Sequence, residues 1–104
     1  MLNSGQRAKL RAMANSIDTI LHIGKDGVTD NVEKQCSGAL AARELIKGRV
    51  LPNSGLTPRE AAGALARRCL AEVVQIAGSR FVLYRENPEI APEKRVKLAA
   101  GARK

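Results

Sequence analysis

Aromatic side chains are nearly absent from this chain of 104 residues, because Phe81 and Tyr84 make up its aromatic 2% and there is no tryptophan. Proteins that bind single-stranded nucleic acid often stack the bases on exposed aromatic rings. With at most two such rings, a stacking platform is not expected. The hydrophobic core must instead be built from Leu, Ile, Val and Ala.

The sequence also lacks any apolar stretch long enough to cross a bilayer, and its N-terminus lacks the apolar segment of a signal peptide. We therefore expect a cytoplasmic protein with no membrane partner. Its two cysteines, Cys36 and Cys69, are far apart and form no Cys-x-x-Cys pair. In a reducing compartment this pattern is typical of buried thiols rather than of a disulfide.

Residues suited to catalysis or metal binding are few. His22 is the only histidine and has no cysteine near it in the sequence, so it cannot build a zinc site. The carboxylates are scattered, and no Ser, His and acid grouping is suggested. Neither the dinucleotide fingerprint nor the Gly-Lys-Ser/Thr of a phosphate-binding loop is present. We expect no enzyme, no metal, no cofactor and no small-molecule substrate.

Positive charge is what the chain has in excess. It carries 18 Lys and Arg against 10 Asp and Glu, which gives a formal net charge of +8. The cations are dispersed, which favours a shaped basic surface over a polybasic arm. Such an excess indicates a polyanionic partner, either nucleic acid or an anionic membrane surface, although a basic surface can also serve solubility alone.

At this length one domain is expected, and local patterns place its elements. Helices are predicted at residues 4–14, 30–42 and 58–70, and strands at residues 19–23, 44–51, 72–77 and 80–85. This α-β-α-β-α-β-β order indicates the α+β class. The domain is expected to cover residues 1–86, and the polar, basic, proline-containing segment 87–104 is expected to be a mobile tail.

Residues typical of helix caps and tight turns support the predicted boundaries of these elements. Ser4 and Thr29 are predicted to cap the first two helices, and Thr57-Pro58-Arg59-Glu60 has the form of a capping box. Gly78-Ser79 fits a two-residue hairpin turn. Gly48 weakens the strand prediction for residues 44–51, because glycine packs nothing and is costly inside a strand.

The segment Gly24-Lys25-Asp26-Gly27 joins a predicted strand to a predicted helix. Its glycines let the backbone approach an anion, and the N–H groups of the following helix point into the same space at the positive end of the helix dipole. Lys25 adds a positive charge, so a phosphate cradle is one interpretation. A purely steric role of glycine in a tight turn is the other, and the spacing alone leaves both open.

Several cations could share a ligand with this loop. Arg7 and Arg11 lie on one face of the first helix, with Lys9 between them in the sequence. Lys47 and Arg49 lie on the second strand, Arg85 ends the last strand, and His22 comes just before the loop. For each of these residues, the ordinary interpretation is a solvated surface side chain.

Five ordered motifs carry a family resemblance: Leu10-Arg11-Ala12-Met13-Ala14, Ile23-Gly24-Lys25-Asp26-Gly27-Val28-Thr29, Glu44-Leu45-Ile46-Lys47, Val74-Gln75-Ile76-Ala77-Gly78 and Val82-Leu83-Tyr84-Arg85. In order and spacing they resemble the CRM domain, the chloroplast RNA splicing and ribosome maturation domain, and most of all its stand-alone bacterial YhbY-type members. The resemblance covers residues 2–86. It implies a four-stranded mixed sheet packed by helices, similar to the C-terminal domain of translation initiation factor three.

The resemblance also implies RNA binding in precursors of the large ribosomal subunit, through the Gly-x-x-Gly loop and neighbouring basic residues. The RNA-binding positions that it carries over are Gly24, Lys25, Asp26, Gly27, Arg7, Arg11 and Lys47. His22 and Arg85 are two further RNA-binding candidates because of where they stand in the sequence. Asp26 stands where the family usually has an uncharged or basic residue, so it is expected to lower the affinity for phosphate. Asn15 replaces a common histidine, and Gly48 replaces the usual valine.

The leading hypothesis is therefore a monomeric RNA-binding protein of ribosome assembly. A protein-interaction adaptor on pre-ribosomal particles, which would recognise ribosomal proteins or assembly factors, is the alternative. Double-stranded DNA is a less favoured ligand, because no helix-turn-helix or dimerising element is visible.

Overall fold

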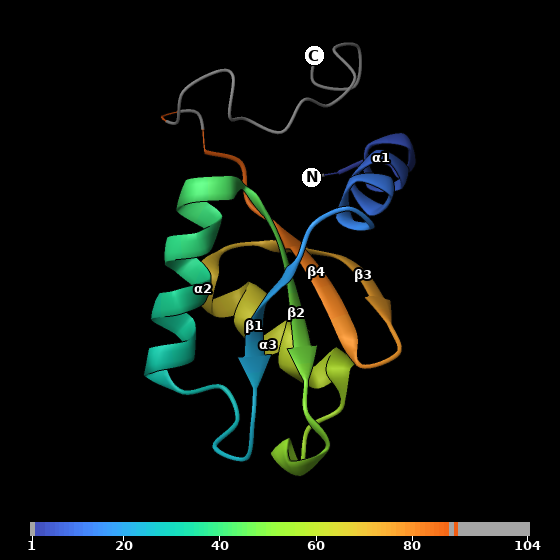
Figure 1. The fold of residues 1–104 in the computed structure, drawn as a ribbon. Coiled ribbons are helices and arrows are strands. Elements are labelled where there is room, and N and C mark those ends of the chain that lie inside the picture. Colours follow the sequence, from blue (N-terminus) through green and yellow to red (C-terminus); the bar gives the residue numbers. More distant parts are fainter. Residues whose placement is uncertain (1, 88, 90–104) are drawn as a thin grey trace.

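The computed structural model describes residues 2–87 and 89 (Figure 1). Its helices are α1 (Ser4–Ala14), α2 (Asp30–Arg43) and α3 (Pro58–Cys69), with a short 3-10 turn, η1 (Pro52–Ser54). Its strands are β1 (Thr19–Ile23), β2 (Leu45–Val50), β3 (Glu72–Ala77) and β4 (Arg80–Tyr84). The predicted α+β class and element order are confirmed, and the boundaries agree within a residue or so.

The four strands form one mixed sheet in the order β1-β2-β4-β3. β1 and β2 are parallel and are joined through α2, whereas β4 is antiparallel to both of its neighbours. Helices α2 and α3 cover one face of the sheet, and α1 packs near one end of the other face (Figure 1). No helix of the described residues covers the rest of that second face, which we call the open face.

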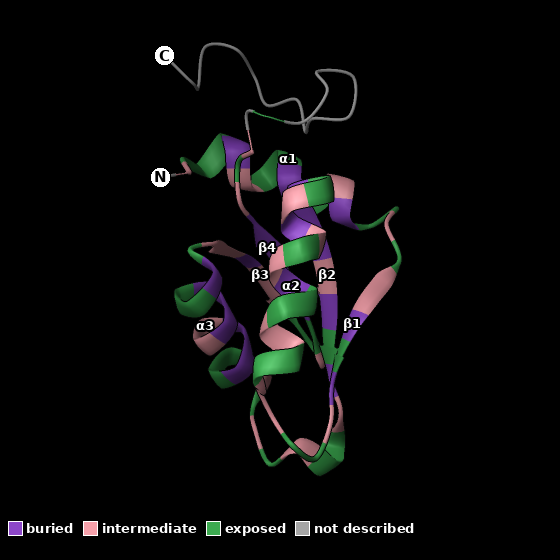
Figure 2. Cartoon of the chain, turned by 90° about the vertical axis from the view of Figure 1, so that its left-hand side faces the viewer, coloured by how far each residue is buried: buried purple, intermediate pink, exposed green. Residues whose placement is uncertain are grey.

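Two hydrophobic clusters follow from the alternation of side chains along the strands. The larger cluster lies between the sheet and the two helices α2 and α3, and includes Ile23, Leu40, Ile46, Leu65 and Phe81. The smaller cluster lies under α1 and contains Leu10, Ala14, Leu45, Val74, Val82 and Tyr84. In Figure 2, the exposed residues of α2 and α3 are on the sides of these helices that face away from the sheet.

Capping explains where the helices begin and corrects one prediction. The cap of α1 is Asn3 and not Ser4: Asn3 Oδ1 accepts from Gln6 N at 2.8 Å, and Gln6 Oε1 accepts from Asn3 N at 3.0 Å. A capping box needs its acceptor three residues before its partner, and only Asn3 has that spacing to Gln6. Thr29 caps α2 and Thr57 forms the predicted box with Glu60.

The strand predicted around Gly48 is present, because β2 continues through this glycine without interruption. β2 pairs with β4 through this position, where Gly48 lies opposite Phe81. A Cβ atom built on Gly48 would come within 2.7 Å of Cε1 of the fully buried Phe81 ring. The ring occupies the space that a side chain would need, so this strand requires glycine.

Glu44 is another correction, because it ends α2 instead of beginning β2. It is fully buried and has a φ of 65°, a left-handed conformation that residues other than glycine rarely adopt. Its backbone carbonyl accepts from Arg85 N at 2.9 Å, and its carboxylate accepts from Asn87 N. The chain after β4 is thereby held against α2 as far as Asn87. The remainder of the predicted tail, apart from residue 89, lies outside the described residues.

The cysteines meet the expectation of buried free thiols. Burial, together with the neighbouring Cys69 thiol, raises the pKa of Cys36 from its ordinary value of 9.0 to about 12. Cys36 therefore stays protonated at neutral pH and is a poor nucleophile or metal ligand. Across the described part of the chain, no three His, Cys, Asp or Glu side chains gather where they could hold a metal ion. Within residues 2–87 and 89, no helix has the length and apolar character needed to cross a bilayer.

Candidate nucleic-acid interface

The Gly24–Gly27 segment is a β-turn closed by a hydrogen bond from Gly27 N to Gly24 O at 2.9 Å. Lys25 and Asp26 form its exposed tip. Gly27 has a φ of 72°, which explains why glycine is used there. Because the turn itself uses the Gly27 N–H, that group is not available to an anion, and the cradle hypothesis depends on the N–H groups of the following helix.

The positive charge at the N-terminus of α2, which follows this turn, is already offset by groups of the protein itself. Val32 N donates to Thr29 Oγ1 at 3.1 Å, and Glu33 N donates to Thr29 O at 2.9 Å. Asp30 and Glu33 place two carboxylates at the positive end of the helix dipole. These groups leave less attraction for phosphate than the sequence alone indicated.

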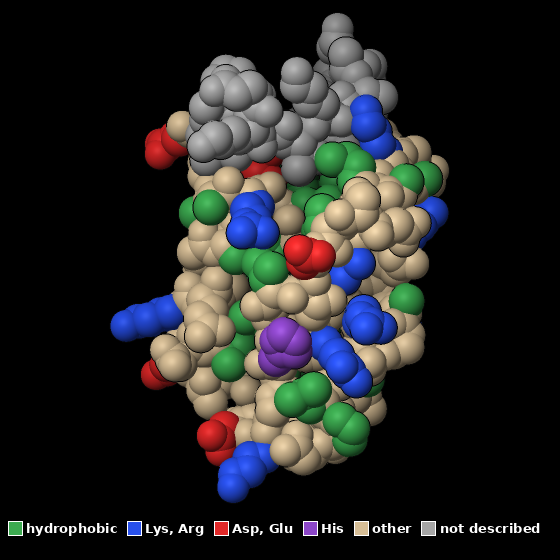
Figure 3. All heavy atoms as spheres, viewed as in Figure 1, with side chains coloured by type: hydrophobic (Ala, Val, Ile, Leu, Met, Phe, Trp, Pro, Cys, Tyr) green, Lys and Arg blue, Asp and Glu red, His purple; other side chains and the backbone are tan. Residues whose placement is uncertain are grey.

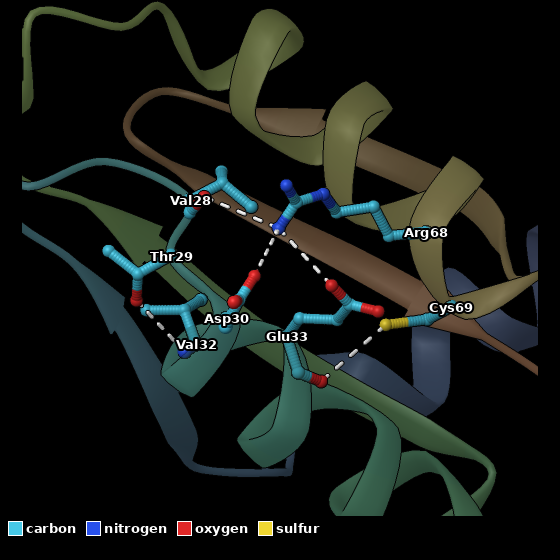
Figure 4. Close-up of polar contacts among 7 residues, drawn as sticks. All are labelled: Val28, Thr29, Asp30, Val32, Glu33, Arg68 and Cys69. Carbon is cyan, nitrogen blue, oxygen red and sulfur yellow. Dashed lines mark hydrogen bonds and ion pairs between the residues drawn. The ribbon is translucent and has the colours of Figure 1, made fainter.

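Arg68 of α3 completes this arrangement (Figure 4). Its Nη1 lies 3.2 Å from Glu33 Oε1 and 3.8 Å from Asp30 Oδ1, and it also donates to Val28 O at 3.5 Å. Positive and negative groups therefore alternate at this end of the molecule, including Lys25 next to Asp26. The loop offers a shaped turn with nearly balanced charge.

The open face of the sheet has a different charge pattern. Across three neighbouring strands, His22 of β1 lies beside Arg49 of β2, and Arg49 lies opposite Arg80 of β4. Lys47 comes two residues before Arg49, so its side chain is on the same face. We call these four residues, His22, Lys47, Arg49 and Arg80, the open-face cluster. Figure 3 shows Lys and Arg side chains gathered beside the single histidine on this side of the molecule.

No acidic strand residue balances this cluster. Glu72 is the only acidic residue in the four described strands, and it pairs with Arg7 at 3.3 Å near α1. Like charges directly opposite each other on neighbouring strands repel each other, and Arg49 and Arg80 are in that position. An anion over the two guanidinium groups would offset this repulsion.

The structure brings some of the predicted residues together. His22 and Lys47 belong to the open-face cluster, and His22 comes two residues before Gly24, so the cluster and the loop are continuous along β1. Arg11 is exposed in the last turn of α1. Arg80 was missed by the sequence reasoning, because nothing local indicates that β4 lies beside β2.

Two predicted cations have intramolecular partners instead. Arg7 donates to Val73 O at 2.7 Å and pairs with Glu72, which ties α1 to β3. Arg85 donates to Cys69 O at 2.8 Å and to Ser37 O at 2.9 Å, which ties the end of β4 to α2 and α3. Arg85 follows Tyr84, which pairs with Leu45 at the start of β2. The Gly24–Gly27 loop follows Ile23, which pairs with Val50 at the end of β2. Arg85 and the loop are therefore at opposite ends of this strand.

Known proteins are similar to this chain in sequence, and one solved structure is similar to it in fold as well. The Probable RNA-binding protein YqeI of Bacillus subtilis is 42% identical over 86% of this chain and 93% of its own length. A protein of Haemophilus influenzae named RNA-binding protein is 31% identical over 85% of this chain and 89% of its own length. The solution structure of a hypothetical protein from Staphylococcus aureus matches with a TM-score of 0.70 and 39% identity, over 86% of this chain and 93% of that one.

The family comparison agrees with these relatives. Residues 2–85 match the model of the CRS1 / YhbY (CRM) domain, which is more than half of the chain. The five motifs, the mixed sheet and the relatives together lead to one conclusion. The chain belongs to the CRS1 / YhbY (CRM) domain family.

Proposed function

We propose that this protein is a non-enzymatic RNA-binding protein whose interface runs from the Gly24–Gly27 loop over the open-face cluster. The observation that carries the proposal is the cross-strand pair of Arg49 and Arg80, since a polyanion over this face would offset the repulsion between the two opposed cations. The names of the relatives in Bacillus subtilis and Haemophilus influenzae support RNA as that polyanion.

Phosphate contacts supply most of the binding energy in this proposal. Cations that neutralise phosphates release counterions, so the affinity should fall steeply with added salt. Phe81 is fully buried and Tyr84 is 5% exposed, so neither ring is available for stacking on bases. The interface thus recognises the shape and backbone of a folded RNA more than its sequence.

Ribosomal RNA in precursors of the large subunit is the target that the family resemblance supports. The test is to titrate purified protein with naked fragments of large-subunit ribosomal RNA at several salt concentrations, with duplex DNA of equal length as competitor. We expect binding to RNA that weakens with salt and is displaced poorly by DNA. Binding only to protein-containing particles would contradict the proposal and favour the adaptor alternative. Crosslinking in cells would then map the contacted RNA site.

A further inference from the structure

A hollow of about 180 Å³ opens on the sheet between the C-terminal end of α1 and strands β2, β4 and β3. Sites for drug-sized ligands are larger, about 300–1,000 Å³. The hollow therefore suits one small group rather than a whole cofactor. It adjoins the open-face cluster, because Lys47 and Arg80 of that cluster are among the residues that line it.

The polar groups around the hollow are of two kinds. Lys47 and Arg80 bring positive charge, and the amides of Asn15 and Gln75 bring both hydrogen-bond donors and acceptors. None of the described residues that line the hollow is acidic. Amides of this kind pair with the edge of a nucleobase, and a guanidinium can stack on its ring.

The remaining lining is apolar and small. Ala14 and Val82 are buried and belong to the cluster under α1, and Ala77 lies exposed at the end of β3. A group with apolar faces and hydrogen-bonding edges fits this combination. A phosphate fits it less well, because the end of α1 at Ala14 and Asn15 is the negative end of a helix dipole. The two cations can hold phosphates at the rim, while the space beside the helix end takes an uncharged ring.

We propose that this hollow receives one unpaired nucleobase, so that the preferred RNA carries a bulged or looped-out nucleotide beside a helical segment. The inference rests on the proposed function, because it assigns a ligand group to the same interface. Paired bases have their edges occupied and cannot enter, whereas an unstacked base can be held by its edge. Lys47 and Arg80 then contact the phosphates on either side of the extruded nucleotide.

Three RNA hairpins with the same stem and loop sequence test this inference. One is fully paired, one has a single bulged nucleotide, and one has an abasic bulge that keeps the ribose and phosphates but lacks the base. We expect the full-length protein to bind the bulged hairpin about tenfold more tightly than the other two, which is the size of effect that hydrogen bonds to one base edge can give. Fluorescence anisotropy at a fixed salt concentration measures the three dissociation constants.

Variants of the hollow make the test specific. Ala77→Ile fills the space and Gln75→Leu removes the amide, and both leave the net charge unchanged. Their matched controls are Ala42→Ile and Gln35→Leu, at exposed positions of α2 on the other side of the sheet. We expect Ala77→Ile and Gln75→Leu to lose the tenfold preference and to bind the paired hairpin as the unmodified protein does. Thermal unfolding checks that each variant is folded.

The outcomes separate this inference from the proposed function. Equal affinity for all three hairpins would overturn the nucleobase site and leave RNA binding intact. Equal affinity for the bulged and abasic hairpins, both above the paired one, would also overturn it, since a kink and not a base would then be recognised. Failure to bind any RNA would overturn the proposed function itself and the inference with it.

Discussion

The loop end and the open face of the sheet differ in how their charges are arranged. At the loop end, Lys25 adjoins Asp26, and Arg68 lies between the carboxylates of Asp30 and Glu33. On the open face, Arg49 has Arg80 opposite it and His22 beside it. The recognisable sequence motif is at the first region, and the unbalanced positive charge is at the second.

This difference follows from distance and screening. Exposed charges interact appreciably only within a Debye length, about 8 Å at physiological salt. A phosphate near Lys25 is within that range of Asp26, so attraction and repulsion largely offset each other. Over the open face, the contributions of neighbouring cations add. We infer that the loop shapes and positions the RNA backbone, while the sheet face provides most of the attraction.

The most severe test of this comparison removes the charge of the open face. Lys47→Gln, Arg49→Gln and Arg80→Gln in one protein should weaken RNA binding by roughly a hundredfold at low salt and lower the slope of log K against log salt by about 2 to 3. The measurement is a salt series of binding titrations.

The control for that variant is Lys34→Gln, Arg59→Gln and Arg67→Gln, which removes the same charge from exposed positions of α2 and α3. It should weaken binding much less. Equal losses in the two proteins would show that net charge matters and the open face does not.

The next test concerns the core packing behind the strand that carries Lys47 and Arg49. Gly48 lies between Lys47 and Arg49 in β2, and a side chain attached at this position would point at the Phe81 ring. Gly48→Val should lower the free energy of unfolding by about 1–3 kcal/mol, because the core there has no room for added methyl groups. Chemical denaturation measures the change.

Phe81→Leu in the same protein should recover part of that loss, since a smaller side chain opposite position 48 makes space. Additive losses in the double variant would contradict a direct contact between the two positions.

Substitution of Arg85 tests whether this cation contributes to the RNA interface or only to stability. Arg85→Gln removes the hydrogen bonds to Ser37 and Cys69. It should lower the free energy of unfolding by about 2 kcal/mol, because the carbonyl of Ser37 within α2 and the carbonyl of Cys69 at the end of α3 lose a charged donor. The RNA affinity of the folded protein should stay within twofold. A large loss of affinity without a loss of stability would return Arg85 to the interface.

The smallest effects are expected at the loop. Lys25→Ala should weaken RNA binding about two- to fourfold, and Asp26→Asn should strengthen it by a similar factor, since each changes one screened, exposed charge. Binding titrations at low and high salt measure both changes, which should shrink at high salt. If Lys25→Ala weakened binding as much as the triple variant of the open face, the loop would be the main attractor and the comparison would fail.

Local patterns were sufficient for much of this protein. The strand 19–23, the box of Thr57 and Glu60, and the Gly78-Ser79 hairpin all have the predicted form. Each depends on hydrogen bonds and periodicity within a few residues, which a sequence shows directly. The cap of α1 was misplaced by one residue because Asn3 and Ser4 both suit a cap, and only the partner Gln6 distinguishes them.

Patterns along the chain were enough to place the elements, the fold class, the family resemblance and the turn that carries the Gly-x-x-Gly motif. They did not place β4 beside β2, the neighbourhood that sets Arg80 opposite Arg49 and the Phe81 ring against Gly48. Nor did they show that Arg85 is bonded to Ser37 and Cys69, far along the chain. Strand order and side-chain packing depend on burial of the whole core, to which residues distant in sequence contribute together.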